Sequence, residues 1–280
     1  HPLVASGEMM IVPGVYDALS AKLAERAGFS GVVLTGYGVA ASLLGEPDFG
    51  LLTQTEVLDT ARRVIGAVKI GVMVDGDTGF GGPLNVKRMV RELIGMGARG
   101  VLLEDQVWPK RCGHMRGKEV VSADEHVAKI RAAVDARGEA PFVITARTDA
   151  LETDGVDEAL RRAKLYKEPG ASVLFVEGPR TVEELRRIGS ELPPPLAVNL
   201  IEGGKTPLCS IEELQQMGFF SVGFVLSGLY SAARALEETY RHLRAHASSE
   251  GLEDRMFRFE EFNQRIGVEE RYQEEARYKG

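Results

Sequence analysis

Acidic side chains follow two successive apolar runs of the sequence, at the point where each run ends. Asp75 and Asp77 follow the first run, Glu104 ends the second, and Asp48 lies in an earlier loop. Mg²⁺ prefers carboxylate oxygens of this kind, and it keeps several waters while it binds few protein groups directly. The sequence therefore predicts a Mg²⁺ site, which Mn²⁺ could also occupy, formed by Asp75, Asp77, Glu104 and Asp48.

A basic segment surrounds one of the two cysteines, and we call Trp108–Lys118 the Cys112 loop. It contains Lys110, Arg111, His114, Arg116 and Lys118. So much positive charge would lower the pKa of the thiol and attract an anionic substrate. We expect Cys112, His114 and Lys110 to be catalytic, together with Arg147 from a later part of the chain. The alternative is a solvated basic loop with an incidental cysteine. A zinc site is not expected, because Cys112 and His114 supply only two ligands nearby.

Further polar residues at the ends of apolar runs could contact a small substrate. They are Thr35, Gly36, Tyr37, Arg147, Glu177, Asn199 and Ser227. Together with the acids, they suit a pocket that binds a metal ion and a carboxylate. Asp105 and Asp149, taken singly, are more simply interpreted as turn formers or helix N-caps. His126 falls in a helical pattern, and we expect it on the surface.

Eight apolar runs, separated by helical patterns, would have to position these residues. They are Met10–Val12, Gly31–Thr35, Ile70–Val74, Gly100–Glu104, Phe142–Thr145, Ser172–Glu177, Leu196–Val198 and Ser221–Ser227. Such alternation indicates parallel strands buried on both faces, and a closed barrel needs about 250 residues. We therefore predict the α/β class, with a single (β/α)₈ TIM-type barrel domain over residues 1–280. A doubly wound open sheet is the alternative, although no G-x-G-x-x-G follows the first run.

Helix boundaries also have local signals. Capping-box spacing occurs at Thr53/Glu56, Ser122/Glu125, Thr181/Glu184 and Ser210/Glu213. The tail over residues 232–280 is helical in pattern and rich in Glu and Arg, with interspersed aromatic side chains. This C-terminal extension is either a solvated helix or a segment whose aromatic residues pack on a neighbouring subunit.

The overall composition excludes several classes of partner. The net charge is −7, which argues against nucleic acid and an anionic membrane surface as partners. No apolar run approaches the roughly 18 residues that a membrane span requires. The two cysteines are too few for a disulfide framework and indicate reduced thiols. We expect a cytoplasmic protein, or one of an organelle matrix if a leader preceded His1.

Five sequence motifs together resemble those of the isocitrate lyase/phosphoenolpyruvate mutase superfamily, and the likeness covers nearly the whole chain. The motifs are Asp75–Gly79, Glu104–Gln106, Lys110–His114, Ala146–Asp149 and Asn199–Pro207. The resemblance is strongest to the branch that holds 2-methylisocitrate lyase, dimethylmalate lyase and the petal death protein. The Lys-x-Cys-Gly-His motif is typical of the lyases, although carboxyvinyl-carboxyphosphonate phosphonomutases also carry it.

The resemblance implies a role for each part of the site. Asp75 would be the principal protein contact of Mg²⁺, with Asp48, Asp77 and Glu104 holding its waters. Backbone amides of Gly36 and Tyr37 would hold the 2-oxo-acid end of the substrate. The resemblance further implies that Arg147 binds and polarises the substrate, that Cys112 is the acid on a closing loop, and that Glu177 and Asn199 line the pocket. It also implies a homotetramer, a dimer of dimers that exchange their C-terminal helices.

These observations predict a Mg²⁺-dependent lyase that cleaves a carbon–carbon bond of a small 2-hydroxy or 2-oxo dicarboxylate, with Cys112 as proton donor. One alternative is an enzyme similar to carboxyvinyl-carboxyphosphonate phosphonomutase, which forms a phosphorus–carbon bond. An alternative of another class is a barrel that binds a dicarboxylate without turnover.

Overall fold

Eight parallel strands close into a barrel in the computed structural model, which describes residues 9–279. The strands are β1 (Met10–Val15), β2 (Gly31–Leu34), β3 (Gly71–Asp75), β4 (Gly100–Glu104), β5 (Val143–Thr148), β6 (Val173–Val176), β7 (Leu196–Asn199) and β8 (Phe219–Phe224). Each strand pairs with the next along the chain, and β1 pairs with β8 to close the barrel. The predicted barrel is confirmed and the open doubly wound sheet is wrong. His1 lies outside the described residues.

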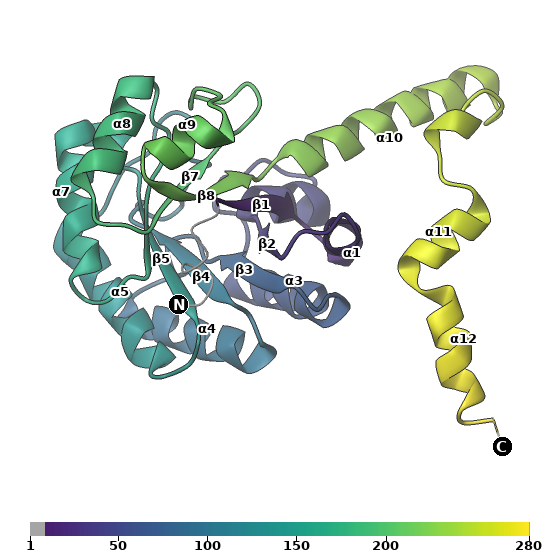
Figure 1. The fold of residues 1–280 in the computed structure, drawn as a ribbon, viewed down its shortest axis with the longest axis horizontal. Coiled ribbons are helices and arrows are strands. Elements are labelled where there is room, and N and C mark those ends of the chain that lie inside the picture. Colours follow the sequence, from purple (N-terminus) through teal and green to yellow (C-terminus); the bar gives the residue numbers. More distant parts are fainter. Residues whose placement is uncertain (1–8, 280) are drawn as a thin grey trace.

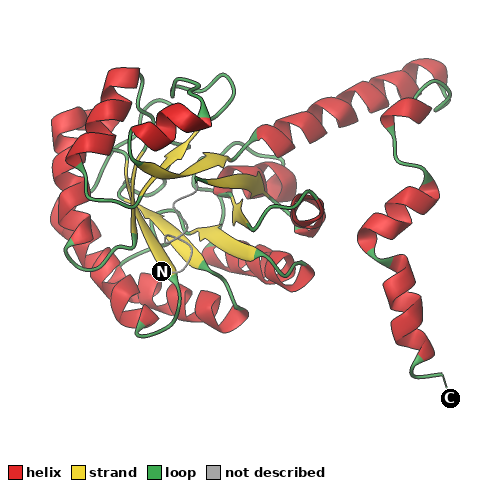
Figure 2. Ribbon diagram, viewed as in Figure 1, coloured by secondary structure: helices red, strands yellow, loops and turns green. Residues whose placement is uncertain are grey.

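Helices surround the barrel and cover its outer face (Figures 1 and 2). They are α1 (Ala18–Arg26), α2 (Gly36–Val39), the π-helix η2 (Ala40–Leu44), α3 (Gln54–Ala67), α4 (Pro83–Met96), α5 (Ala123–Arg137), α6 (Ala150–Asp154), α7 (Val156–Lys167), α8 (Val182–Glu191) and α9 (Ile211–Gln216). Capping boxes begin α3, α8 and α9, as predicted, whereas Ser122 caps α5 without a returning bond from Glu125. Gly97 ends α4 at a φ of 88°, a conformation that favours glycine.

The last strand begins and ends earlier than the sequence predicts. We expected Ser221–Ser227, whereas β8 spans Phe219–Phe224 and Ser227 is the first residue of the next helix. Phe219 is buried and pairs with Leu196, and Leu226 is also buried although it lies beyond the strand. The apolar run continues past the strand because its last residues pack at the mouth of the barrel, so hydrophobicity alone misplaced the boundary.

The C-terminal segment has a different architecture from the barrel. It consists of α10 (Ser227–His246), a short 3₁₀ turn η3 (Glu253–Arg255), α11 (Phe259–Ile266) and α12 (Val268–Ala276). Helix α10 leads away from the barrel, and α11 and α12 then run back along the side of the barrel on which α1 lies (Figure 1). These four elements contain no buried residue, in contrast to every strand of the barrel. Across residues 9–279, no helix is both long and apolar enough to cross a membrane.

Candidate active site

A cavity of about 180 Å³ opens at the carboxyl ends of the barrel strands. Most of the residues that we expected to contact substrate or metal line it: Thr35, Tyr37, Asp48, Asp75, Lys110, Cys112, His114, Arg147, Glu177 and Asn199. Its deeper part is lined by apolar side chains of the strands, such as Val33, Met73 and Phe175. The active sites of TIM barrels lie at this end, so the topology explains how residues far apart in sequence meet here.

Four carboxylates, those of Asp48, Asp75, Asp77 and Glu104, lie around Lys110, and we call this group the acidic corner. Lys110 Nζ lies 2.7 Å from Asp48 Oδ1 and 2.6 Å from Asp77 Oδ1. Burial raises the pKa of Asp77 to about 7, although the charge of Lys110 opposes the shift. Burial likewise raises the pKa of Glu104 well above its ordinary value. The corner therefore holds more carboxylates than the ammonium at its centre can neutralise.

The donor chemistry of the acidic corner fits a divalent cation. Neither oxygen of Asp77 or Glu104 receives an aligned hydrogen bond from the described part of the chain, although all four oxygens are buried. Such oxygens are costly to bury, and a hard cation would satisfy them. Within residues 9–279, no three His, Cys, Asp or Glu side chains already converge as a metal-binding group. Mg²⁺ usually keeps several waters and binds few protein groups directly.

Asp75 is the member of this corner that is best placed to contact a bound cation. It is half-buried and lines the cavity, whereas Asp77 and Glu104 are buried behind it. Its Oδ1 accepts a hydrogen bond from the backbone N–H of Asp77 at 3.2 Å. Its Oδ2 accepts one from the N–H of Gly36 at 3.1 Å. These two backbone donors hold the carboxylate in place at the end of β3.

A second buried group is built around Arg147, and we call it the Arg147 network. Nε and Nη2 of Arg147 donate to the two oxygens of Asp149 at 2.8 and 2.9 Å. Nη1 lies 3.2 Å from both Glu177 and Glu104. Lys118 Nζ donates to Asp149 at 2.8 Å. Burial would raise the pKa of Asp149, but the charges of Arg147 and Lys118 outweigh it and hold that pKa well below its usual range.

The thiol of Cys112 differs from our expectation. We predicted that the basic loop would lower its pKa, whereas burial raises it to about 11. Burial is the largest cause, and the nearby cations are engaged with other partners. Lys110 is paired with the acidic corner and Lys118 with Asp149, while Arg111 Nη1 donates to backbone carbonyl oxygens. The thiol at this site is therefore protonated at neutral pH.

The backbone of the Cys112 loop packs directly against the Arg147 network. A Cβ atom added to Gly113 would lie 2.3 Å from Glu177 Cγ and 2.5 Å from Arg147 Nη2. These distances are so short that a side chain at this position would force its neighbours to shift. The backbone N–H of Cys112 donates to the carbonyl oxygen of Asp48 at 3.2 Å. Glycine next to the cysteine thus allows the loop to close on the cavity between the two charged groups.

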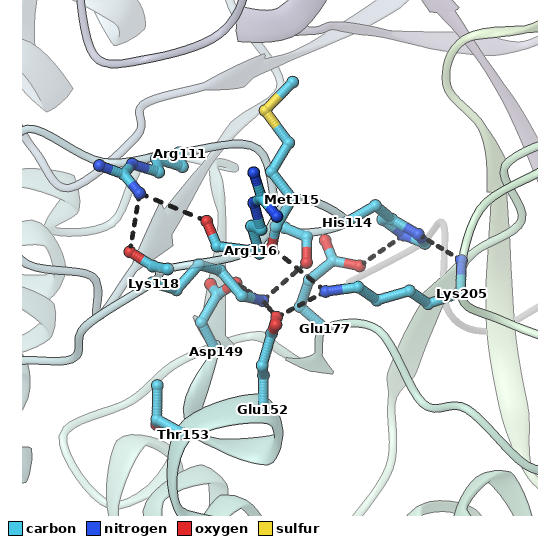
Figure 3. A network of polar contacts seen from close by, with 12 residues as sticks. Arg111, His114, Met115, Arg116, Lys118, Asp149, Glu152, Thr153, Glu177 and Lys205 are labelled. Atoms are coloured by element: carbon cyan, nitrogen blue, oxygen red, sulfur yellow. Dashed lines mark hydrogen bonds and ion pairs between the residues drawn. The ribbon is translucent and has the colours of Figure 1, made fainter.

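His114 connects the Cys112 loop to two other loops (Figure 3). Its Nδ1 accepts a hydrogen bond from the backbone N–H of Lys205 at 2.8 Å. Its Nε2 lies 3.1 Å from Glu177 Oε1, a polar contact that is close but not aligned as a full hydrogen bond. An imidazole that accepts at Nδ1 is neutral and carries its proton on Nε2. The structure thus places His114 in a bridging position, and its catalytic role stays a prediction.

The segment after β2 forms a short helix rather than an open loop. The Thr35 hydroxyl caps α2 by accepting from Gly38 N–H at 2.9 Å. The Gly36 amide, which we expected to contact substrate, instead donates to Asp75. Tyr37 lies in the first turn, where backbone amides have no partner within the helix. The backbone amide of Gly36 is therefore already bonded to Asp75, whereas the contact between the Tyr37 amide and substrate stays a prediction.

The two predicted contacts from the last strands differ in their position. Asn199 lines the cavity at the end of β7, and a Cβ atom on Gly223 would lie 2.4 Å from its Oδ1. Ser227 does not line the cavity, and its hydroxyl donates to Glu202. The early end of β8 explains the difference, because Ser227 belongs to α10.

Sequence reasoning missed several buried polar residues near the site. Asp149 is a principal partner of Arg147 rather than a simple turn former. Asp105 is fully buried and accepts from the Tyr166 hydroxyl at 2.7 Å. His126, which we expected on the surface, is fully buried with its ring 4.5 Å from that of Tyr166, and burial lowers its pKa to about 3. The signal that was available is the spacing of His126 with apolar residues on one face of α5.

Comparisons with known proteins agree with this fold and show the family of the chain. A family model described as phosphoenolpyruvate phosphomutase matches residues 1–244. The chain is 49% identical over 280 residues to the petal death protein of Dianthus caryophyllus, covering 100% of this chain and 88% of the relative. It is 45% identical over 282 residues to the chloroplastic carboxyvinyl-carboxyphosphonate phosphorylmutase of Arabidopsis thaliana, covering 99% and 83%. The solved structure of a 2,3-dimethylmalate lyase, described as a PEP mutase/isocitrate lyase superfamily member, superimposes with a TM-score of 0.94 at 35% identity, covering 100% of this chain and 93% of that one.

Proposed function

Because the chain belongs to the phosphoenolpyruvate phosphomutase family, within the PEP mutase/isocitrate lyase superfamily, we propose that it is a Mg²⁺-dependent carbon–carbon lyase. Its substrate would be a small 2-hydroxy or 2-oxo dicarboxylate, such as a 2-alkylmalate, 2-methylisocitrate or oxaloacetate. The products would be a 2-oxo acid (or oxalate, if the substrate is a hydrated 2-oxo acid) and a second carboxylate. The observation that carries the proposal is that one cavity is lined by the thiol-bearing Cys112, by members of the acidic corner and by the buried Arg147.

The acidic corner supplies the metal half of this chemistry. Asp75 would hold Mg²⁺, with Asp77, Asp48 and Glu104 around its waters. When bound, the ion supplies Lewis acidity toward the oxygens of the substrate. The apolar side chains below the corner would accept an alkyl substituent, because they offer no hydrogen-bond partner.

The Arg147 network and Cys112 supply the other half. Loss of the C2 hydroxyl proton lets the C2–C3 bond break, and its electron pair passes to C3 and into the adjacent carboxylate. The guanidinium of Arg147 would stabilise this developing charge in a site closed to water. The S–H group of Cys112 would then donate its proton to C3, and the thiolate would recover a proton from solvent. A thiol that stays protonated at neutral pH suits this step.

A second candidate function is favoured by the likeness to the Arabidopsis phosphorylmutase. Under this hypothesis, a cation at the acidic corner and the guanidinium of Arg147 would stabilise the anionic phosphorus group as it is transferred to carbon. Incubation with Mg²⁺ and a panel of 2-alkylmalates, 2-methylisocitrate, oxaloacetate and a phosphonate separates the two. Cleavage of a dicarboxylate would support the lyase, rearrangement of the phosphonate would support the mutase, and binding without turnover would support a non-catalytic barrel.

The thiol provides the sharpest test of the lyase. Cys112→Ser keeps a hydroxyl of similar shape, but its pKa is too high for efficient proton donation. We expect kcat to fall by roughly 10²–10⁴-fold while substrate binding changes little. Cys209→Ser is the matched control, because Cys209 lies outside the cavity. Near-normal turnover of the Cys112 variant would show that another group delivers the proton.

We further propose that the C-terminal helices pack on other subunits of a homotetramer. They expose large apolar side chains, with Phe259 82% and Tyr240 63% exposed. Exposed apolar surface of this extent is typical of protein–protein contacts. Light scattering on the full chain should give a tetramer, and deletion from about Leu252 should weaken it. A stable, active monomer of the full chain would contradict this assembly.

A further inference from the structure

Three segments of the barrel meet at one place (Figure 3): the Cys112 loop, the loop between β7 and α9, and helix α6. Lys205, in the loop between β7 and α9, donates through Nζ to Glu152 Oε2 at 2.7 Å and to the carbonyl oxygen of Met115 at 3.1 Å. Lys118 Nζ lies 3.1 Å from the same Glu152 oxygen. This Oε2 atom of Glu152, on α6, therefore receives one cation from the Cys112 loop and one from outside it.

The same contacts reach the inside of the cavity. Lys118 also donates to Asp149 at 2.8 Å and to the carbonyl oxygen of Gly113 at 2.7 Å. Because Asp149 holds Arg147, the closed position of the loop is linked to the guanidinium that faces the substrate. The side chains of Lys205 and Glu152 are only 23% and 19% exposed. An ion pair that is largely withdrawn from water is screened less than one on the open surface.

We propose that Lys205 and Glu152 are positioning residues that latch the Cys112 loop in its closed position over the cavity. Lys205 holds the loop from one side through Met115, and Glu152 holds it from the other through Lys118. Neither residue lines the cavity that holds the acidic corner and Arg147, although Lys205 lines a second pocket that opens beside Cys112. The latch therefore acts on that cavity through the position of the loop. It sets the fraction of time during which Cys112 is shielded from solvent. This inference goes beyond the proposed function and does not depend on which substrate is cleaved.

The rate at which Cys112 reacts with iodoacetamide measures loop opening without any substrate. The parent is Cys209→Ser, so that labelling, followed by mass spectrometry, reports one thiol. Lys205→Met and Glu152→Gln should each label roughly tenfold faster, the expected result of losing a hydrogen bond to a charged group. Because the two residues share the Lys205–Glu152 ion pair, the acceleration in the double variant should be smaller than the product of the two single accelerations.

The direction of the two changes separates loop opening from a change in the thiol itself. Removing the Lys205 cation would raise the pKa of Cys112 and slow labelling, whereas removing the Glu152 anion would lower that pKa and speed labelling. Opening of the loop speeds labelling in both variants. Opposite changes in rate, or no change in either variant, would therefore overturn the latch.

Arg180→Met is the matched control. Arg180 lies 3.6 Å from the other oxygen of Glu152, is 53% exposed, and has no contact with the Cys112 loop among the interactions of the described residues. It should label at the parental rate, and an equal acceleration would contradict the proposal. Lys205→Arg should restore slow labelling because it keeps the cation. Unchanged melting temperatures would exclude general unfolding as the cause of faster labelling. If Lys205→Met is less stable, the labelling rates of Glu152→Gln and Lys205→Arg still test the latch.

Discussion

Buried carboxylates flank the cavity on two sides, and they differ in the number of cations that face them. In the acidic corner, four carboxylates surround Lys110, and burial raises the pKa of Asp77 and Glu104. In the Arg147 network, Asp149 is equally buried, yet its pKa is lowered because Arg147 and Lys118 both bind it. Asp77, Glu104 and Asp149 are equally buried, so the number of cations that face each carboxylate decides whether its pKa is raised or lowered. The first group can accept a further cation, and the second is already neutralised and holds structure in place.

The largest expected effect comes from breaking the neutralised side. Asp149→Asn keeps the size of the side chain but leaves Arg147 and Lys118 buried without their shared anion. Removing one partner of a buried ion pair costs about 3–5 kcal/mol of unfolding free energy. Urea unfolding at neutral pH measures this loss. Asp157→Asn, which removes an exposed partner of Arg187, is the control and should change stability by less than about 0.5 kcal/mol.

The loss should also depend on pH with a definite sign. The pKa of Asp149 in the folded state lies below its ordinary value of 3.8, so the folded state binds fewer protons than the unfolded state in acid. Its contribution to stability is full above the ordinary value and is lost as pH falls through the folded pKa. The difference between wild type and Asp149→Asn should therefore shrink only in acid. A difference that shrinks at neutral pH would contradict the assignment.

The next effect tests whether the acidic corner accepts a cation. Free Mg²⁺ at a hundred times its Kd should stabilise the fold by about 2.7 kcal/mol, measured as a rise in melting temperature. Because burial raises the pKa of Asp77 to about 7, protons compete with the metal below that pH. The stabilisation should be full well above pH 7 and decline as the pH falls through about 7. Asp75→Ala should remove the rise, and a rise that is independent of pH would exclude Asp77 from the site.

The smallest effect tests how closely the Cys112 loop packs against the Arg147 network. Gly113→Ala adds a methyl group against Glu177 and Arg147, and overpacking of this kind costs about 1–3 kcal/mol. If the cost falls on closure of the Cys112 loop, kcat/KM should fall roughly tenfold to hundredfold. Gly66→Ala is the control, because no atom lies within 4 Å of its added Cβ. Equal behaviour of the two variants would mean that the loop does not close against the network.

Much of the fold followed from local features of the sequence. Apolar runs of strand length, capping residues such as Thr53 and closing glycines such as Gly97 act within a few residues, so the order of strands and helices could be predicted. The rule that active sites lie at the carboxyl ends of barrel strands then selected Asp75, Glu104 and Arg147. The family resemblance rested on the same short motifs, and the family comparisons confirmed it.

Only the tertiary structure decided how the polar residues are paired. The sequence shows five basic or imidazole side chains around Cys112, but neither the burial that raises the pKa of the thiol nor the pairing of Lys110 and Lys118 with carboxylates from other loops. His126 on a helix gave no sign that Tyr166 would cover it. Helix caps and apolar periodicity are local, so a sequence displays them directly. The charge of a buried group depends on desolvation and on partners far along the chain, and these exist only once the barrel has brought its loops together.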